Sequence, residues 1–475
     1  MTMTMNELPG LTDLGVVDAA AALARRDVSA VELTAACLAR IEAVDGAHSH
    51  DGDPESINAW VRVYADDARA AAARADDLLA VGDHHAPLLG VPVGLKDLYG
   101  VRGKPITASS RLLHEVPAQD CDLWQRLQAA GMVLLGHVHT HEFAAGGTTD
   151  QVGSPWDVTR SAGGSSGGSA AALAARMVPA ATGTDTAGSL RIPSACCGTS
   201  TIKPTRGHVS LAGVVPLSWS LDHAGPMARS LADCRALLAA MIGADRGRAE
   251  SALHGFGAAA DVSWPAGEVR IAVSPRIVRS ELDDDVAAGF QRALDACRSL
   301  GATVIEPDAP VAGLDVDDFL DVLTTDMAAY HRRFDGQHDL YRPSLREWAE
   351  LGGSRAVSGE RYAATQARRR ETTAAWARWF DQHGITAVIE PTIPTVAPTR
   401  GAGYEHAGTD VALISLTHFW NWTGFPVAAL PSGLGDVSGM PVSVSLIGPA
   451  AADWRTLALG IELQNVLGVP DFPNL

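Results

Sequence analysis

Residues 163–193 read GGSSGGSAAALAARMVPAATGTDTAGSLRIP, in which two glycine- and serine-rich segments flank an apolar stretch. The first, Gly163–Ser169, precedes an alanine-rich run that predicts a helix. The second, Gly183–Pro193, follows the apolar run Met177–Ala181, which predicts a buried strand. Glycines at such points free the backbone and leave amide hydrogens that can point at an anion or a developing oxyanion. A flexible Gly/Ser linker is the alternative for Gly163–Ser169, but the strand and helix patterns on both sides disfavour it.

Outward from this stretch, short apolar runs alternate with helical segments and glycine turns. Strands that alternate with helices predict an α/β fold, with a mostly parallel or mixed sheet covered on both faces by α-helices. A helix from about Leu282 to Leu300, followed by Gly301, belongs to the same scheme. The predicted strands are Leu88–Leu95, Met132–Leu135, Met177–Ala181, Val269–Val273 and Thr303–Ile305.

The two remaining regions are predicted to be helical. Residues 1–80 are rich in alanine, and Ser29 followed by Glu32 forms a capping box ahead of an apolar stripe that ends near Gly46. Residues 316–383 are helical in pattern, charged and unusually aromatic. Because no flexible linker or internal repeat separates these parts, we expect one large domain over residues 1–475.

Composition excludes several classes of protein. The chain has 47% hydrophobic and 19% charged residues, which predicts a globular protein. It carries 37 lysines and arginines against 55 acidic residues, a net charge of −18, so autonomous binding to nucleic acid or to an anionic membrane is not expected. No apolar run approaches about 18 residues, and Met1–Gly10 does not have the character of a secretory signal. Six cysteines without C-x-x-C spacing fit a soluble protein of the reducing cytoplasm.

Ser189 and Lys96 are the residues that point to chemistry. Ser189 lies in a turn after a predicted strand, where its hydroxyl is exposed and neighbouring backbone amides can converge on one oxygen. Lys96 ends an apolar strand within the segment Gly90–Asp97. A serine hydroxyl needs a base that takes its proton, and a lysine can serve only when burial or a nearby cation keeps it neutral. A second hydroxyl between them could pass the proton in both directions.

Other motifs allow other interpretations. G-x-S-x-G frames centred on Ser165 and Ser166 match a nucleophile elbow, for which Asp222 and His223 could complete a Ser-His-Asp triad. Ser200 to Lys203 fits S-x-x-K, but the other penicillin-binding motifs are missing, and the Gly-Lys-[Ser/Thr] of a phosphate-binding loop is missing too. Three histidines spaced for one side of a strand could bind a metal or simply belong to the core: His137, His139 and His141.

Three segments together resemble the amidase signature family of serine hydrolases. They are GVPVGLKD from Gly90, GGSSGGSAAAL from Gly163 and GTDTAGSLRIPSACCGTSTIKPTRG from Gly183, in the order in which the family has them. Weaker similarity covers nearly the whole chain. The resemblance implies a central mixed β-sheet between helices, with residues 82–230 as signature core, 316–383 as variable substrate region and 385–475 as the rest of the core.

The resemblance also assigns site residues. It implies that Ser189 is the nucleophile, that Ser165 is a bridging serine preceded by a cis peptide bond, and that Lys96 is the base. One departure is Ala187, where many members have glycine; if the loop needs a positive φ there, alanine costs about 1 kcal/mol or more. The implied oxyanion donors are the backbone amides of Thr186, Ala187, Gly188 and Ser189, and the implied supporting residues are Ser166, Asp185 and Arg191.

The expected activity is hydrolysis of C–N bonds through an acyl-enzyme, with no cofactor and no metal. The expected partner is a small-molecule amide or carbamate, because aromatic residues at 419–425 and 316–383 could line an apolar pocket that prefers anilides or aryl carbamates. The oligomeric state stays open, with a homodimer as one option. The alternatives are the amide-hydrolysing subunit of a tRNA-dependent amidotransferase, a Ser-His-Asp α/β-hydrolase and a non-catalytic binding protein.

Overall fold

The computed structural model describes residues 10–46, 48–83, 85–243, 268–310, 316–406, 408–473 and 475. Nearly all of Met1–Gly10, in which the sequence predicts no secretory signal, lies outside these ranges. Within them, no helix has the length and apolar character needed to cross a bilayer.

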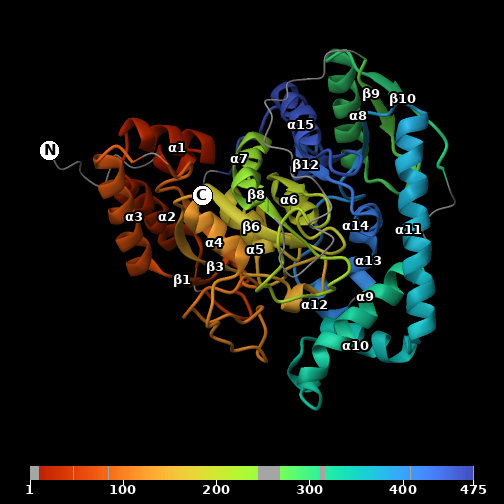
Figure 1. Cartoon of the computed structure of the whole chain (residues 1–475), viewed down its shortest axis with the longest axis horizontal. Coiled ribbons are helices and arrows are strands. Elements are labelled where there is room, and N and C mark those ends of the chain that lie inside the picture. The colour runs from red at the N-terminus through yellow and green to blue at the C-terminus, as the bar shows by residue number, and fades with distance from the viewer. Residues whose placement is uncertain are drawn as a thin grey trace.

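A large mixed β-sheet forms the centre of the molecule, and helices flank it, as the sequence predicts (Figure 1). In the described part of the chain its order is β1-β3-β2-β6-β8-β7-β12-β13-β11-β9-β10. Its strands are β1 Trp60–Val63, β2 Pro92–Lys96, β3 Val133–Val138, β6 Ala180–Asp185, β7 Ser200–Lys203, β8 His223–Ala228, β9 Arg270–Val273, β10 Thr303–Ile305, β11 Ala387–Pro391, β12 Val427–Leu434 and β13 Pro441–Ile447, and a separate hairpin pairs β4 Gly153–Ser154 with β5 Asp157–Ser161.

Strand direction differs between the middle and the two sides of the sheet. β2 runs parallel to β3 and β6, and β9 runs parallel to β10 and β11. From β6 through β8, β7, β12 and β13 to β11, every pairing is antiparallel. The parallel pairing of β2 with β6 matters for the site, because the carboxyl ends of parallel strands meet at one edge of a sheet.

All five predicted strands are present, but only β10 has the predicted boundaries; β9 begins one residue late, β3 runs on to Val138, and β2 and β6 begin three or more residues late. The strand predicted from Leu88 begins at Pro92, after Gly90, whose φ is +86°. The strand predicted from Met177 begins at Ala180, because the amide of Met177 donates to Ala172 O in the turn that ends the preceding helix. Periodicity does not separate such a turn from the strand that follows it.

The predicted helices also form. The Ser29–Glu32 capping box is present at the start of α2, and α8 lies within the range predicted for it. The helices are α1 Val16–Arg25, α2 Ala30–Val44, α3 Ala65–Ala80, α4 Asp122–Ala129, α5 Gly167–Ala174, α6 Arg191–Cys197, α7 Leu231–Met241, α8 Asp284–Ser299, α9 Val316–His331, α10 Pro343–Arg355, α11 Gly359–Gln382, α12 Ala402–Glu405, α13 Gly408–Ile414, α14 His418–Thr423 and α15 Asp453–Leu467.

The prediction that residues 1–80 are entirely helical is wrong at β1. This four-residue strand pairs antiparallel with β3. The Asp45 carboxylate, just after α2, accepts hydrogen bonds from the amides of Ala59 and Trp60 and so leads the chain into the strand. Trp60–Val63 lies between the helices α2 and α3 in an alanine-rich region, and the helical pattern on both sides hides its short strand signal.

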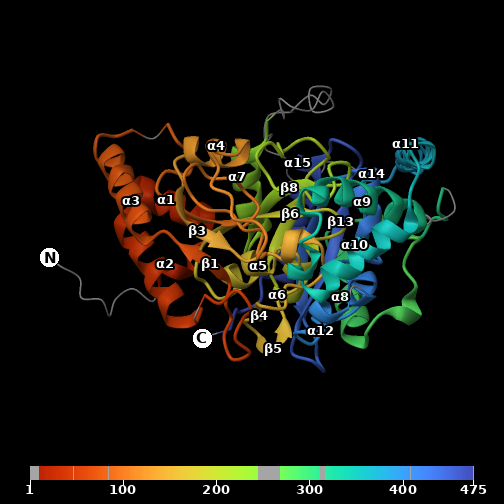
Figure 2. The ribbon, with the colours of Figure 1, turned by 90° about the horizontal axis from the view of Figure 1, so that it is seen from below.

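The two faces of the sheet pack against different helices. Val444 and Leu446 of β13 belong to a large hydrophobic cluster with residues of α8 and α15. Ile447, which points to the opposite face, packs instead with Trp376 of α11 and Trp420 of α14. The helices α1–α3 gather at one end of the molecule and α11 stands at the other end, an arrangement that the turned view shows again (Figures 1 and 2).

Candidate functional site

The site lies beyond the carboxyl ends of two parallel neighbours, β2 and β6. Lys96 is the last residue of β2, and Asp185 is the last residue of β6. Cα pairing of Val93 with Ala180 and of Gly94 with Ala181 sets the register. The sequence segments that resemble the amidase signature therefore meet at one edge of the sheet, although the chain between Lys96 and Ser189 contains several other elements.

Lys96 contacts two hydroxyl groups. Its Nζ donates to Ser165 Oγ at 2.7 Å and to Thr184 Oγ1 at 2.8 Å. Ser165 stands just before α5, and the peptide bond between Gly164 and Ser165 is cis. Lys96 and Ser165 are fully buried. Sequence reasoning missed Thr184. The available signal was that Thr182 and Thr184, two residues apart, place two polar side chains on the same face of β6.

Burial lowers the pKa of Lys96 to about 7, although Asp185 and Asp222 act in the opposite direction. The cause is desolvation, because a charged ammonium group loses its water in this position. Its two side-chain partners are neutral hydroxyls, which compensate a positive charge less well than a carboxylate does. A substantial fraction of Lys96 is therefore neutral near pH 7.

A buried ion pair closes the loop from Asp185 to Arg191. Arg191 Nε and Nη2 each lie 3.0 Å from a different carboxylate oxygen of Asp185. The amide of Leu190 also donates to this carboxylate, at 3.1 Å. Burial alone would raise the pKa of Asp185, but the charge and the hydrogen bonds of Arg191 lower it below its ordinary value. The Asp185 carboxylate is thus charged, and the loop between the two residues carries Ser189.

The loop itself turns at Gly188. Its φ is +141°, whereas Ala187 is not among the residues with positive φ. Alanine at position 187 therefore does not carry the conformational penalty that a non-glycine residue with positive φ would have. Gly188 O accepts the amide of Ile192 at 2.7 Å, so the turn leads directly into α6.

Ser166, expected to support the bridging serine, caps α5 by position without a side-chain cap bond. Its Oγ donates to Thr184 O at 3.4 Å. Ser166 therefore contacts the backbone of the same β6 residue whose hydroxyl binds Lys96.

Ser189 lines an apolar pocket beside Thr186 and Ala187. Its walls come from distant parts of the chain, including two helices of the region 316–383. Sequence reasoning proposed Trp348 for the pocket but did not identify the other lining residues, which are Ala144, Ala145, Gly146, Gly147, Leu217, Leu323, Met327 and Ile414.

Most aromatic residues that the sequence proposed for the pocket lie in the core instead. Trp348 is the exception and lines the pocket. The run at 419–425 is buried in two hydrophobic clusters, in which Trp422 packs near α9 and α10 while the others pack near α11. The members of this run with exposed fractions of at most 1% are Phe419, Trp420, Trp422 and Phe425.

The alternative serine triad is not assembled. His223 Nδ1 lies 2.7 Å from Leu221 O and 3.2 Å from Asp185 O, whereas Asp222 accepts from Thr186 Oγ1 at 2.6 Å. Neither residue contacts Ser165 in the described hydrogen-bond network, because the side chain next to Ser165 Oγ is Lys96.

The three histidines do not converge. β3 ends at Val138, so only His137 lies in that strand, and each ring has its own hydrogen-bond partners. His137 bonds to Tyr64 and Tyr99, His139 to Ser109 and Gln151, and His141 to Thr148. No group of three or more metal-ligating side chains is present in the part of the chain that the structure describes.

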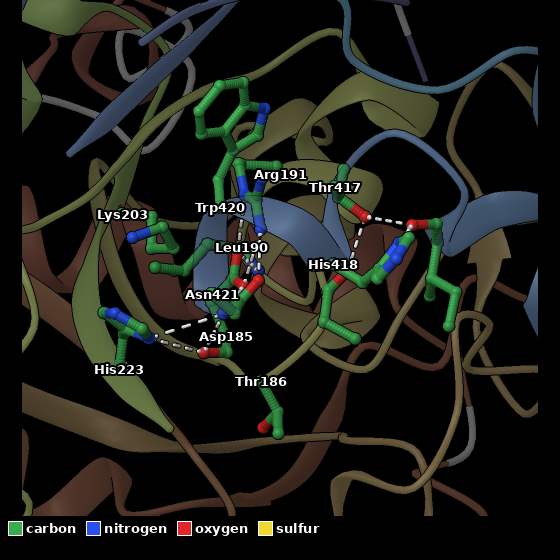
Figure 3. Close-up of polar contacts among 12 residues, drawn as sticks. Asp185, Thr186, Leu190, Arg191, Lys203, His223, Thr417, His418, Trp420 and Asn421 are labelled. Atoms are coloured by element: carbon green, nitrogen blue, oxygen red, sulfur yellow. Dashed lines mark hydrogen bonds and ion pairs between the residues drawn. The ribbon is translucent and has the colours of Figure 1, made fainter. Parts of the chain in front are cut away.

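Two further polar residues reach the loop from the carboxyl-terminal part. Thr417 contacts Ala187, and Asn421 contacts Asp185 and Arg191 (Figure 3). Sequence reasoning did not identify them. Polar residues four apart within an otherwise aromatic segment were the available signal, because buried polar side chains need partners.

Comparison with known proteins gives one consistent family. A protein-family model described as Amidase matches residues 32–457. A glutamyl-tRNA(Gln) amidotransferase subunit from Anaeromyxobacter dehalogenans (strain 2CP-C) is 34% identical over 492 residues, which cover 96% of this chain and 97% of that protein. The structure of 6-aminohexanoate cyclic dimer hydrolase has 27% identity and a TM-score of 0.83, covering 96% of this chain and 97% of that one. A peptide amidase in complex with chymostatin has 25% identity and a TM-score of 0.80, with 97% and 99% covered.

The turn at Gly188 allows a direct test of the loop. A Cβ at Gly188 would clash with Thr417 Oγ1, and the φ of +141° disfavours any side chain. We expect Gly188→Ala to lower the free energy of unfolding by about 1–3 kcal/mol, measured by denaturant titration. The matched variant Ala187→Gly should change it by less than about 1 kcal/mol. Equal effects of the two variants would contradict this account of the loop.

Proposed function

The chain belongs to the amidase family of enzymes that act on C–N bonds, and from this premise we propose that it hydrolyses amides through an acyl-enzyme on Ser189. The observation that carries the proposal is the buried contact of Lys96 Nζ with Ser165 Oγ at 2.7 Å, at the sheet edge next to the Ser189 loop. The pKa of about 7 supports Lys96 as a base at neutral pH.

In the proposed reaction, neutral Lys96 takes the proton of Ser165 while Ser165 takes the proton of Ser189. Ser189 Oγ then forms a bond to the carbonyl carbon, and the carbonyl oxygen becomes an oxyanion that backbone amides of the loop Thr186–Ser189 stabilise. The proton returns along the same path to the nitrogen, the C–N bond breaks and the amine leaves. Water attacks the ester on Ser189 by the same relay and releases the acid.

The pocket supports a substrate with an apolar group next to the scissile bond. Leu217, Leu323, Met327 and Trp348 give the pocket an apolar lining, which gives a small polar amide few contacts. The cavity volume is about 30 Å³, so an aryl group would enter only when lining side chains move. We extend the proposal to anilides and N-aryl carbamates. Attack on a carbamate would expel the amine and leave a carbonate ester on Ser189, which water would convert to alcohol and carbon dioxide.

A second candidate function is the amide-hydrolysing subunit of an amidotransferase. The relatives at about 34% identity over nearly the full chain favour it. In that case the natural amide would be glutamine, and the ammonia would pass to another substrate. The apolar pocket favours the first candidate, because a glutamine side chain offers little apolar area.

The nucleophile and the base can be tested by substitution in the purified chain, assayed alone. We expect Ser189→Ala and Lys96→Ala each to lower kcat by about 10³-fold or more on an anilide, because each removes one member of a unit that acts together. Ser194→Ala is the matched control: this buried serine of α6 has an Oγ without a hydrogen-bond partner among the described residues, so activity should be retained. Substantial activity in Ser189→Ala would refute the assignment. A wild-type chain that releases ammonia only from glutamine would favour the amidotransferase.

The pH dependence follows from Lys96. Raising the pH through about 7 removes its proton and increases the neutral, active fraction. We therefore expect kcat/KM to rise from pH 5.5 and to level off above about 8, with roughly one tenth of the maximum at pH 6. Far-ultraviolet circular dichroism at each pH controls for unfolding. A flat profile, or a midpoint near the ordinary lysine value, would contradict a neutral Lys96 as the base.

Substrate preference can be measured by competition at equal concentrations. We expect anilides and N-aryl carbamates to have higher kcat/KM than acetamide or malonamate, because the aryl group buries apolar area against the pocket. Met327→Gln should lower kcat/KM for the aryl substrate by about tenfold and leave that for acetamide nearly unchanged. Wild-type preference for the small polar amides would show that this pocket does not receive the substrate.

A further inference from the structure

The segment around α14 contacts the backbone of the Ser189 loop at two points. Thr417 and Asn421 are four residues apart, one turn of helix, and face the same loop (Figure 3). Thr417 Oγ1 donates to Ala187 O. Asn421 Nδ2 donates to Asp185 O at 2.8 Å and to Asp185 Oδ1 at 2.7 Å.

The orientation of the Asn421 amide is determined by its neighbours. Its Oδ1 accepts from Arg191 Nη2 at 2.7 Å, while its Nδ2 faces the oxygens of Asp185. Turning the amide over would place its oxygen against a carboxylate and its NH₂ against a guanidinium group. Asn421 is fully buried, so both contacts are shielded from water.

These two contacts determine where the next amides point. The C=O and N–H of a planar trans peptide point in opposite directions. The peptide bonds of this loop are trans, because the cis bond among the described residues is Gly164–Ser165. Holding Asp185 O and Ala187 O toward α14 therefore turns the N–H groups of Thr186 and Gly188 away from it. Since Ala187 lines the pocket beside Thr186, the freed amides belong to the loop that faces the substrate.

The segment that makes these contacts is itself held in place. Arg369 of α11 donates to Asn421 O at 3.0 Å and to Trp422 O at 2.6 Å. Trp420, which belongs to α14, packs in a hydrophobic cluster with Trp376 of α11. Thr417 and Asn421 therefore project from a turn that other contacts hold in place. A side chain can orient another group only if it is itself fixed.

We propose that Thr417 and Asn421 are positioning residues for the oxyanion site: they hold alternate carbonyls of the loop so that the amides of Thr186 and Gly188 point at the substrate oxygen. The proposal rests on the proposed function. It assigns these residues an effect on the transition state, because hydrogen bonds from the loop amides strengthen as negative charge develops on the substrate oxygen, so their alignment matters more there than in the ground state.

Thr417 offers a set of closely matched variants. Thr417→Val keeps the branched shape and removes the hydroxyl donor, whereas Thr417→Ser keeps the hydroxyl and removes a methyl group. For Thr417→Val we expect kcat on an anilide to fall about 100-fold with KM changed less than threefold. Thr417→Ser should stay within about fivefold of wild type. Asn421→Leu, which removes both polar contacts, should behave like Thr417→Val or be more severe.

Affinity for a tetrahedral mimic separates positioning from general structural support. Phenylboronic acid adds to the nucleophile and places an oxygen where the oxyanion forms, so its Ki should rise in Thr417→Val by about the same factor as kcat falls. Thermal denaturation monitors folding, and if Thr417→Val does not fold, Thr417→Ala is compared with Thr417→Ser in the same way. Unchanged kcat, a loss confined to KM, or an unchanged Ki alongside lower kcat would each overturn the proposal. Failure of the function itself would appear separately, as an active Ser189→Ala enzyme.

Discussion

The buried ion pair between Asp185 and Arg191 is the interaction on which the site depends. Two charges removed from water are tolerated only with good geometry and additional hydrogen bonds. Here Arg191 binds both carboxylate oxygens, and Leu190 N and Asn421 add further donors. The pair joins the end of β6 to the start of α6, so the intervening residues, Ser189 among them, must form a tight turn.

The same ion pair influences Lys96. The Asp185 carboxylate accepts two hydrogen bonds from Arg191 and one each from Leu190 N and Asn421, which uses its acceptor sites. Lys96 Nζ instead contacts the hydroxyls of Ser165 and Thr184. Asp185 still raises the pKa of Lys96, but burial outweighs it. A lysine with hydroxyl neighbours in a dry environment can exchange a proton at neutral pH, whereas a lysine paired to a carboxylate would stay charged.

The helical region 316–382 has two structural connections to the site. α9 and α10 contribute Leu323, Met327 and Trp348 to the pocket wall, and α11 contributes Arg369, which holds α14. A change in these helices can therefore alter both the space available to a substrate and the support of the loop. Replacing this region with that of a relative would therefore change the Ser189 loop as well as the substrate preference.

Features that depend on neighbouring residues could be predicted from the amino-acid sequence. Apolar runs predicted the strands, the Ser29–Glu32 box predicted α2, and glycine segments with their serines predicted turns at Ser165 and Ser189, because these signals are local. Which distant groups meet could not be predicted, because it depends on how the elements pack. Thr417 and Asn421 lie more than 200 residues from the loop that they contact, and the aromatic run at 419–425 turned inward because the adjacent sheet face and α11 needed an apolar partner. Burial and long-range partners depend on how elements pack against each other, and no local pattern encodes that packing.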